Sequence, residues 1–206
     1  MDSAHVQSPR PAGTWPRVAI LLGLWLALAL LLGASGRLAT LRPPAPQELV
    51  LSLTVATLVA CRMVPWLQAW ALSVDPRWLL VLHLSRFVGI VFLRLSASGA
   101  LSPAFAVPAG WGDLVVVLGA VALLLAGRPQ GAARRVAYVA WNVIGLIDIV
   151  GVVLTAARVG MADPGGVAPL LHLPLSLLLT YFVPLIIATH VLLFVRLGRW
   201  PAASGA

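Results

Sequence analysis

Six long apolar stretches constrain this chain more than any other feature of its sequence. A helix needs about 20 residues to cross ~30 Å of hydrocarbon, and each stretch reaches about that length. The stretches cover residues 18–36, 47–64, 78–100, 109–127, 136–157 and 174–195. They predict an all-α fold, a polytopic transmembrane helical bundle of six spans that forms one transmembrane domain over residues 1–206.

The composition places the excess apolar surface in lipid. The chain has 206 residues, of which 61% are hydrophobic and 10% are charged, whereas soluble domains are about 45–50% apolar and about 25% charged. One small core cannot bury so much apolar surface, so the lipid bilayer is the expected partner. All fourteen cationic residues are arginines, and they lie singly or in pairs between apolar runs. This spacing argues against a nucleic-acid interface, and the single cysteine excludes an intrachain disulfide.

Arginine counting near the span ends gives the orientation. With a cytoplasmic N-terminus, nine arginines flank the spans on that side: Arg10, Arg17, Arg62, Arg77, Arg128, Arg134, Arg135, Arg196 and Arg199. Four lie on the other side: Arg37, Arg42, Arg94 and Arg158. Both termini are therefore predicted to be cytoplasmic, with residues 1–16 as a short N-terminal tail. A cleaved signal peptide is the alternative for the first stretch, because basic residues precede it and "GASG" ends it.

Two segments are expected to depart from regular spanning helices. "VPWLQAWALSVDP", residues 64–76, is rich in tryptophan and is predicted to lie at the level of the lipid headgroups. "AFAVPAGWGD", residues 104–113, is predicted to form a re-entrant or tightly turned segment at the outer face. The reason is that Pro108, Gly110 and Gly112 disfavour regular helix.

The third stretch carries three ionisable side chains in apolar surroundings. At 100° per residue, His83 and Arg94 lie within about 20° of each other, and Arg86 lies about 60° away. Ser85 and Gly89 lie on roughly the opposite side, where small residues allow another helix to approach closely. The third span is therefore expected inside the bundle, because a charge at mid-span costs at least ~2.5–3.5 kcal/mol on insertion scales.

Alternating helix directions sort the polar residues of the spans into three layers. The inner layer holds His83, Asn142 and His190, the middle layer holds Arg86, Asp148 and Tyr181, and the outer layer holds Arg94, Asp113 and His172. Pairing removes most of the cost of a buried charge. We therefore expect two ion pairs, Arg86 with Asp148 and Arg94 with Asp113. These layered side chains are the candidates for a substrate or ion pathway.

Several of these assignments have a structural alternative. Arg94 can extend to the outer headgroups, and Asp113 can cap the N-terminus of the fourth helix. His190 can reach the inner interface, and Asn142 can form an interhelical hydrogen bond. The middle-layer pair lies too far from the span ends for such roles, which leaves a functional site or a purely structural ion pair.

Three segments resemble a pattern found in small, uncharacterised multi-pass membrane proteins of bacteria: "FAVPAGWGDLVVVLGAVA", "WNVIGLIDIV" and "PLSLLLTYFVPLIIATHVLLF". The resemblance covers about residues 80–195. It includes the positions of Gly110, Gly112, Asp113, Asn142, Asp148 and His190. It implies a helical bundle in the bacterial inner membrane, and it implies no activity.

No GxxxxGKS, HExxH or GxSxG motif is present, so no common catalytic motif assigns an activity. The favoured hypothesis is transport or conduction of a small solute or ion by the layered polar groups. Because 206 residues form a narrow bundle, such a pathway favours a homo-oligomer. The alternatives are a non-catalytic accessory or assembly protein, a haem protein with His83 and His190 as axial ligands, and a lipid-modifying enzyme that uses Asp113 and His172.

Overall fold

The computed structural model describes residues 14–199, and within that range the chain folds into helices without any strand. The α-helices are α1 (Thr14–Ala34), α2 (Ala45–Met63), α3 (Pro65–Ser73), α4 (Pro76–Leu82), α5 (Gly89–Ala97), α6 (Pro103–Ala126), α7 (Ala132–Ala162) and α8 (Val183–Gly198). Three short 3₁₀-helices are η1 (Arg37–Thr40), η2 (His83–Val88) and η3 (Gly165–Leu171). One π-helical turn, η4 (Leu178–Phe182), leads directly into α8.

Five helical segments of the described chain are each long and apolar enough to cross a membrane. They are Thr14–Ala34, Pro76–Ala97, Pro103–Ala126, Ala132–Ala162 and Leu178–Gly198. The pair α2 and α3 gives a sixth candidate if it counts as one broken span, with a bend of 95° between the two helices. The predicted all-helical fold is therefore confirmed for the described residues, with five to six helical segments that could span a membrane. The bend lies at Val64, between α2 and α3, where the predicted headgroup-level segment starts.

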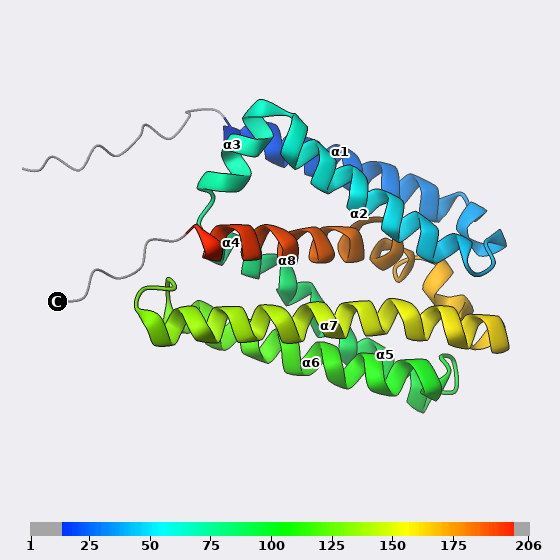
Figure 1. Ribbon diagram of the computed structural model, residues 1–206. Helices are drawn as coiled ribbons and strands as arrows, with labels where there is room; N and C mark the ends of the chain where they lie inside the picture. The colour runs from blue at the N-terminus through cyan, green and yellow to red at the C-terminus, as the bar shows by residue number, and fades with distance from the viewer. Residues whose placement is uncertain (1–13, 200–206) are drawn as a thin grey trace, which may run out of the picture.

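The helices form one bundle with α8 near its centre (Figure 1). Helix α8 packs against α2, α4 and α7, while α6 packs against α5, η2 and α7. The start of α1 and the end of α8 lie at the same end of the bundle (Figure 1). The arginines of the predicted cytoplasmic side, apart from Arg10, which lies outside the described residues, belong to segments at this end, which we call the arginine-rich end. The opposite end carries η1 and η3.

The third span is not a continuous α-helix, because residues His83–Val88 form the 3₁₀-helix η2 between α4 and α5. A 3₁₀-helix turns about 120° per residue instead of about 100°, so six residues add roughly 120° of rotation. The extra rotation moves Arg94 off the face that His83 occupies. His83 and Arg86 are each 1% exposed, whereas Arg94 lies on the surface of α5. The expectation that all three share a polar face is wrong for Arg94.

The predicted re-entrant segment at residues 104–113 is also wrong, because α6 runs unbroken from Pro103 to Ala126. Pro103 occupies the first turn, where its missing N–H costs nothing, and Gly127 ends the helix at φ 86°. Pro108 remains inside, as membrane helices tolerate. The glycines serve packing: a Cβ on Gly89 would lie 2.5 Å from the carbonyl oxygen of Gly110. The predicted close-packing face of the third span is thereby confirmed at Gly89.

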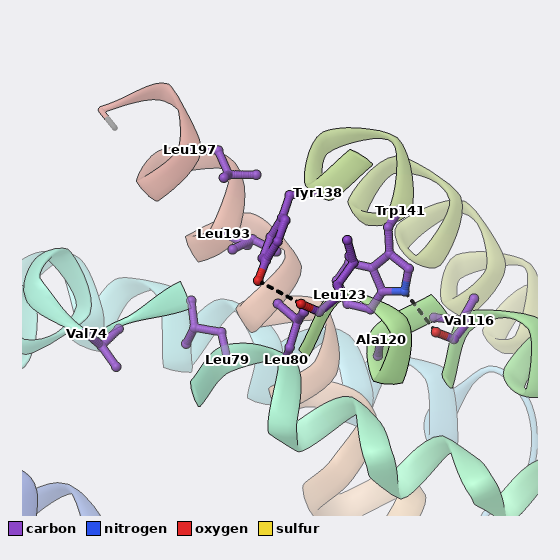
Figure 2. Packing of buried hydrophobic residues seen from close by; sticks show 10 residues of the cluster. All are labelled: Val74, Leu79, Leu80, Val116, Ala120, Leu123, Tyr138, Trp141, Leu193 and Leu197. Atoms are coloured by element: carbon purple, nitrogen blue, oxygen red, sulfur yellow. Dashed lines mark hydrogen bonds between the residues drawn. The ribbon is translucent and has the colours of Figure 1, made fainter. Parts of the chain in front are cut away.

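An apolar cluster fills the arginine-rich end of the bundle (Figure 2). It joins residues from α4, α6, α7 and α8, together with Val74: Val74, Leu79, Leu80, Val116, Ala120, Leu123, Tyr138, Trp141, Leu193 and Leu197. The polar atoms of its two aromatic residues are satisfied by backbone carbonyls. Trp141 donates to Val116 at 2.8 Å, and Tyr138 donates to Gly127 at 2.7 Å. None of these residues is charged, and we call this cluster the inner plug.

Candidate functional site

Arg86 lies at the centre of a buried ion cluster that joins three helical segments. Its Nη1 donates to Asp113 of α6 at 3.1 Å and to Asp148 of α7 at 2.5 Å. Its Nη2 donates to the carbonyl oxygen of Gly145 at 3.0 Å. The predicted pair of Arg86 with Asp148 is therefore confirmed. The predicted pair of Arg94 with Asp113 is wrong, because Asp113 binds Arg86 instead.

The depth of Asp113 follows from where α6 begins. Ten residues separate Asp113 from Pro103, and ten helical residues rise about 15 Å, half of the ~30 Å hydrocarbon layer. A helix that began near residue 109 would have put Asp113 in its first turn and near the outer face. The proposed capping role is excluded for the same reason. Asp113 thus joins the middle layer instead of the outer one.

The charges of the ion cluster do not balance when both carboxylates are ionised. One guanidinium faces two carboxylates, so the cluster carries a net charge of minus one. The Nε of Arg86 also has no acceptor within residues 14–199, although the side chain is 1% exposed. Asp148 is 17% exposed, against 4% for Asp113. The cluster therefore suits one further positive charge, either a bound cation or a proton on a carboxyl group.

A second polar layer lies next to the ion cluster on the side of the inner plug. Asn142 of α7 donates to the carbonyl of His190 at 3.0 Å and accepts from its Nδ1 at 2.8 Å. His83 and the Thr189 hydroxyl lie 3.2 Å apart, and the two imidazoles meet with ring centroids 4.4 Å apart. His83, Asn142 and His190 are all at most 1% exposed. The predicted grouping of these three residues is confirmed, and His190 is buried inside the bundle.

Gly145 connects the two layers. Its carbonyl oxygen accepts the Arg86 Nη2 hydrogen bond, and a Cβ at this position would lie 2.6 Å from Cε1 of His190. The Nε2 of His190 and Nδ1 of His83 have no partner in the described part of the chain. A polar path of buried groups therefore extends from the carboxylates to the histidines within two helical turns of α7, over residues 142–148.

An apolar pocket of about 140 Å³ leads from the η1–η3 end of the bundle to the ion cluster. Arg86 and Asp113 line its inner part, and Arg42, Gln47 and His172 lie among the residues near its opening. Most of the remaining lining is aliphatic and comes from α2, α7, η3, η4 and α8. The inner plug packs at the other end of the bundle. This pocket reaches the ion cluster from the η1–η3 end, whereas Asp148, which is 17% exposed, does not line it.

Two other candidates lie outside this arrangement. Tyr181 of η4 is buried against Trp25 of α1, with ring centroids 5.4 Å apart, and belongs to a separate apolar cluster with Ala29 and Leu185. His172 is exposed beyond η3, and no hydrogen bond or ion pair joins it to Asp113 among residues 14–199. The geometry therefore gives no support to an acid–base pair of these two residues in a lipid-modifying enzyme.

The histidine layer does not fit haem. Axial ligation by two histidines places the porphyrin plane between the two imidazoles, but the rings of His83 and His190 touch edge to face. Both histidines also pack against Trp141, with centroids 4.9 Å and 5.5 Å away. No space for a macrocycle is left. Nor does the described chain bring together three His, Cys, Asp or Glu side chains in a way that suits a metal ion.

A comparison with known protein families places most of the chain in one family. Residues 44–198 match the family described as "Domain of unknown function (DUF8737)". The chain belongs to this family. The matched region begins just before α2, includes every residue of the ion cluster and the histidine layer, and leaves α1 outside. Searches of curated proteins and of solved structures gave no match.

Three groups that take part in the two polar layers were not predicted from the sequence. They are the Gly145 carbonyl, the Thr189 hydroxyl and the Trp141 ring, which line or join the polar layers. Each lies close in the sequence to a predicted residue. Gly145 is three positions before Asp148, Thr189 is one before His190, and Trp141 is one before Asn142. A backbone carbonyl carries no signal in the sequence. For Thr189 and Trp141 the available signal was their position next to His190 and Asn142 in an otherwise apolar stretch.

Proposed function

We propose that the protein conducts protons across the membrane, alone or coupled to a small and mostly apolar solute, through the ion cluster of Arg86, Asp113 and Asp148. The observation that carries this proposal is the position of the cluster. It lies at the inner end of an apolar pocket and, with both carboxylates ionised, carries one uncompensated negative charge. Buried ionisable groups at mid-membrane depth are typical of proton relays and ion pathways.

The breaks in the two helical segments next to the cluster support the same proposal. Arg86 and His83 lie on the 3₁₀-helix η2, and the π-turn η4 precedes α8, which carries His190. Broken helices near the middle of the membrane surround the binding sites of many transporters. A 3₁₀ stretch within a helix also marks a common hinge position. These two segments are our candidates for moving parts.

The access from the η1–η3 end supports an alternating mechanism. A pocket reaches the ion cluster from the η1–η3 end, while the inner plug separates the histidine layer from the arginine-rich end. A proton that enters along the pocket would bind at Asp113. It would then need a rearrangement of the inner plug to leave by way of His83 and His190. The Nδ1 and Nε2 acceptors of these imidazoles suit that step, because the described chain offers them no partner.

We further propose six spans in a bacterial inner membrane, with both chain ends cytoplasmic. The support is the arginine distribution, since eight described arginines belong to the arginine-rich end and four to the other. Reporter fusions after Arg135 and Arg199 are expected to read cytoplasmic. Fusions near Ala104 and Gly165 are expected to read external. A cytoplasmic signal at Gly165 would contradict the six-span topology.

Proton conduction is tested with purified full-length protein in liposomes that contain a trapped pH-sensitive dye. Under an imposed pH gradient, we expect faster proton entry than in protein-free liposomes. Asp113→Asn removes a proton-binding carboxyl group, so we expect it to lower the flux about tenfold or more. The matched control is Asp163→Asn, because Asp163 lies in the loop after α7 and accepts only the backbone N–H of Gly166.

The outcomes separate the proposal from an accessory role. Flux equal to that of empty liposomes would overturn proton conduction. If Asp113→Asn and Arg86→Gln proteins stay folded by circular dichroism and keep full flux, these residues have no part in the pathway. Their function would then be to hold the helices together, as expected for an accessory or assembly protein.

A further inference from the structure

A second pocket lies at the arginine-rich end, and no residue of the ion cluster or the histidine layer lines it. It has a volume of about 380 Å³ and lies between α1, α3, the start of α4, the α6–α7 loop and the end of α8. Its lining is unlike that of the first pocket, because it combines arginines with indole rings. The arginines are Arg77, Arg128 and Arg196, and the tryptophans are Trp15, Trp70 and Trp78.

Two arginines of this pocket, Arg77 and Arg128, are held by one carboxylate. Asp75 accepts from Arg128 Nε at 2.8 Å and from Arg77 Nη2 at 3.3 Å, and its Oδ1 accepts the Arg77 backbone N–H. Burial acts to raise the pKa of Asp75, but the hydrogen bonds from Arg77 and Arg128 outweigh it and lower the pKa below its usual value. Asp75 therefore stays charged and fixes both side chains at the pocket wall.

Arg77 and Arg128 keep a positive charge and donors despite Asp75. Their two guanidinium groups face the one carboxylate of Asp75, which leaves a net charge of plus one for these three residues. Each guanidinium has five N–H donors, and Asp75 takes one from Arg128 and two from Arg77. Both side chains are also exposed by more than 40%. Most of their N–H donors thus make no hydrogen bond within residues 14–199 and are open to an outside acceptor.

The indole rings supply a further donor and an apolar wall. Trp15 meets Trp70 and Trp78 edge to face, with centroids 5.6 Å and 5.7 Å away. The Nε1 of Trp70 is buried at the pocket and has no acceptor within residues 14–199. Farther along α1, which provides Trp15 to the pocket, a row of large aliphatic side chains is exposed: Ile20, Leu21, Leu24 and Leu28. Tryptophan next to an aliphatic surface is typical of the membrane–water interface.

We propose that this pocket binds the phosphate group of an anionic phospholipid. The phosphodiester would accept from Arg77, Arg128 and the Trp70 Nε1–H, and the acyl chains would lie along the exposed face of α1. Arginine binds phosphate through paired N–H donors, and basic pockets between membrane helices on the cytoplasmic side bind anionic headgroups. The site lies at the opposite end of the bundle from the first pocket's opening and uses no residue of the ion cluster or the histidine layer, so its test does not rest on the proposed proton pathway.

The test compares thermal unfolding of the full-length protein in detergent with added phosphatidylglycerol or phosphatidylcholine. We expect a Tm increase with phosphatidylglycerol that phosphatidylcholine does not give. The double variant Arg77→Gln/Arg128→Gln is expected to lose it. The matched control Arg37→Gln/Arg158→Gln removes two exposed arginines from the opposite end and is expected to keep it. An equal increase in all three proteins would overturn the site, because it would reflect net charge alone.

Two further arms sharpen the assignment. Trp70→Phe removes one hydrogen bond to a charged group, so the affinity for phosphatidylglycerol is expected to fall roughly tenfold. Trp66→Phe on the same helix is the control, because Trp66 does not line the pocket. An unchanged affinity of Trp70→Phe would exclude the proposed contact. A Tm increase of equal size with inorganic phosphate alone would overturn the assignment to a lipid.

Discussion

The Arg86→Gln substitution is expected to lower the free energy of unfolding by about 3–5 kcal/mol, the cost of breaking a buried ion pair. The guanidinium is the counter-charge of two carboxylates, Asp113 and Asp148, and also binds the carbonyl of Gly145. Glutamine keeps a hydrogen-bond donor but removes the charge. Two buried carboxylates then face each other unpaired. Unfolding in lipid nanodiscs, followed by tryptophan fluorescence, measures the loss.

A mutant cycle identifies the cause of this loss. Removing the carboxylates in the Arg86→Gln background, with Asp113→Asn and Asp148→Asn, is expected to recover part of the stability, because no unpaired charge remains. Arg94→Gln is the matched control on the neighbouring helix. Arg94 is exposed and pairs with no carboxylate within residues 14–199, so a change within about 0.5 kcal/mol is expected. Additive effects of the three substitutions would show that the cluster does not act as a unit.

The sequence predicted the ion pair of Arg86 and Asp148 for a simple physical reason. Arg86 and Asp148 were the only oppositely charged residues placed deep in two spans, and lipid leaves a buried charge few partners. Likewise, the predicted inner layer came from helix direction and residue position, and His83, Asn142 and His190 do meet. The depth of a residue within a span can be predicted from its position in the helix when the predicted ends of that helix are correct. The apolar runs placed most ends within a few residues.

The wrong predictions arose at two places in the backbone. At one the backbone departs from a regular α-helix, and at the other a regular α-helix is longer than predicted. Nothing in the letters of residues 83–88 distinguishes a 3₁₀-helix from an α-helix, because tertiary contacts decide between them. The resulting rotation misplaced Arg94. In α6 the opposite error was made. Pro108 and two glycines predicted a break in the helix, but the helix is continuous because neighbouring helices prevent the break. That shift of the helix start carried Asp113 from the outer layer into the ion cluster.

The pockets were beyond sequence reasoning for a different reason. Each is formed by segments distant in the chain, such as α2, η3 and η4 around the apolar pocket. Residue spacing within one helix says which side chains share a face, but it does not say which helices leave a gap between them. Arg42 and Asp75 are typical: each has an ordinary position near a helix end, and only the fold places them at a pocket.

The close approach of Gly89 to α6 leads to the other large expected effect. Gly89→Ala is expected to destabilise the protein by about 1–3 kcal/mol, the usual cost of overpacking. The new Cβ would lie 2.5 Å from the Gly110 carbonyl oxygen and 3.0 Å from the Cβ of Asp113. Backbone cannot move aside as a flexible side chain can, so the third span and α6 must separate. Asp113 would then move relative to Arg86.

Gly151→Ala on α7 is the matched control with the opposite sign. A Cβ on Gly151 would meet nothing within 4 Å, so the substitution adds no clash. In the interior of a helix, alanine is favoured over glycine by about 0.5–1 kcal/mol. We therefore expect Gly89→Ala to lower the unfolding temperature and Gly151→Ala to leave it unchanged or raise it. Because Gly89→Ala also displaces Asp113, it is expected to reduce proton flux in liposomes, whereas Gly151→Ala keeps it. An equal response of the two variants would mean that the contact between Gly89 and Gly110 does not set the distance between these helices.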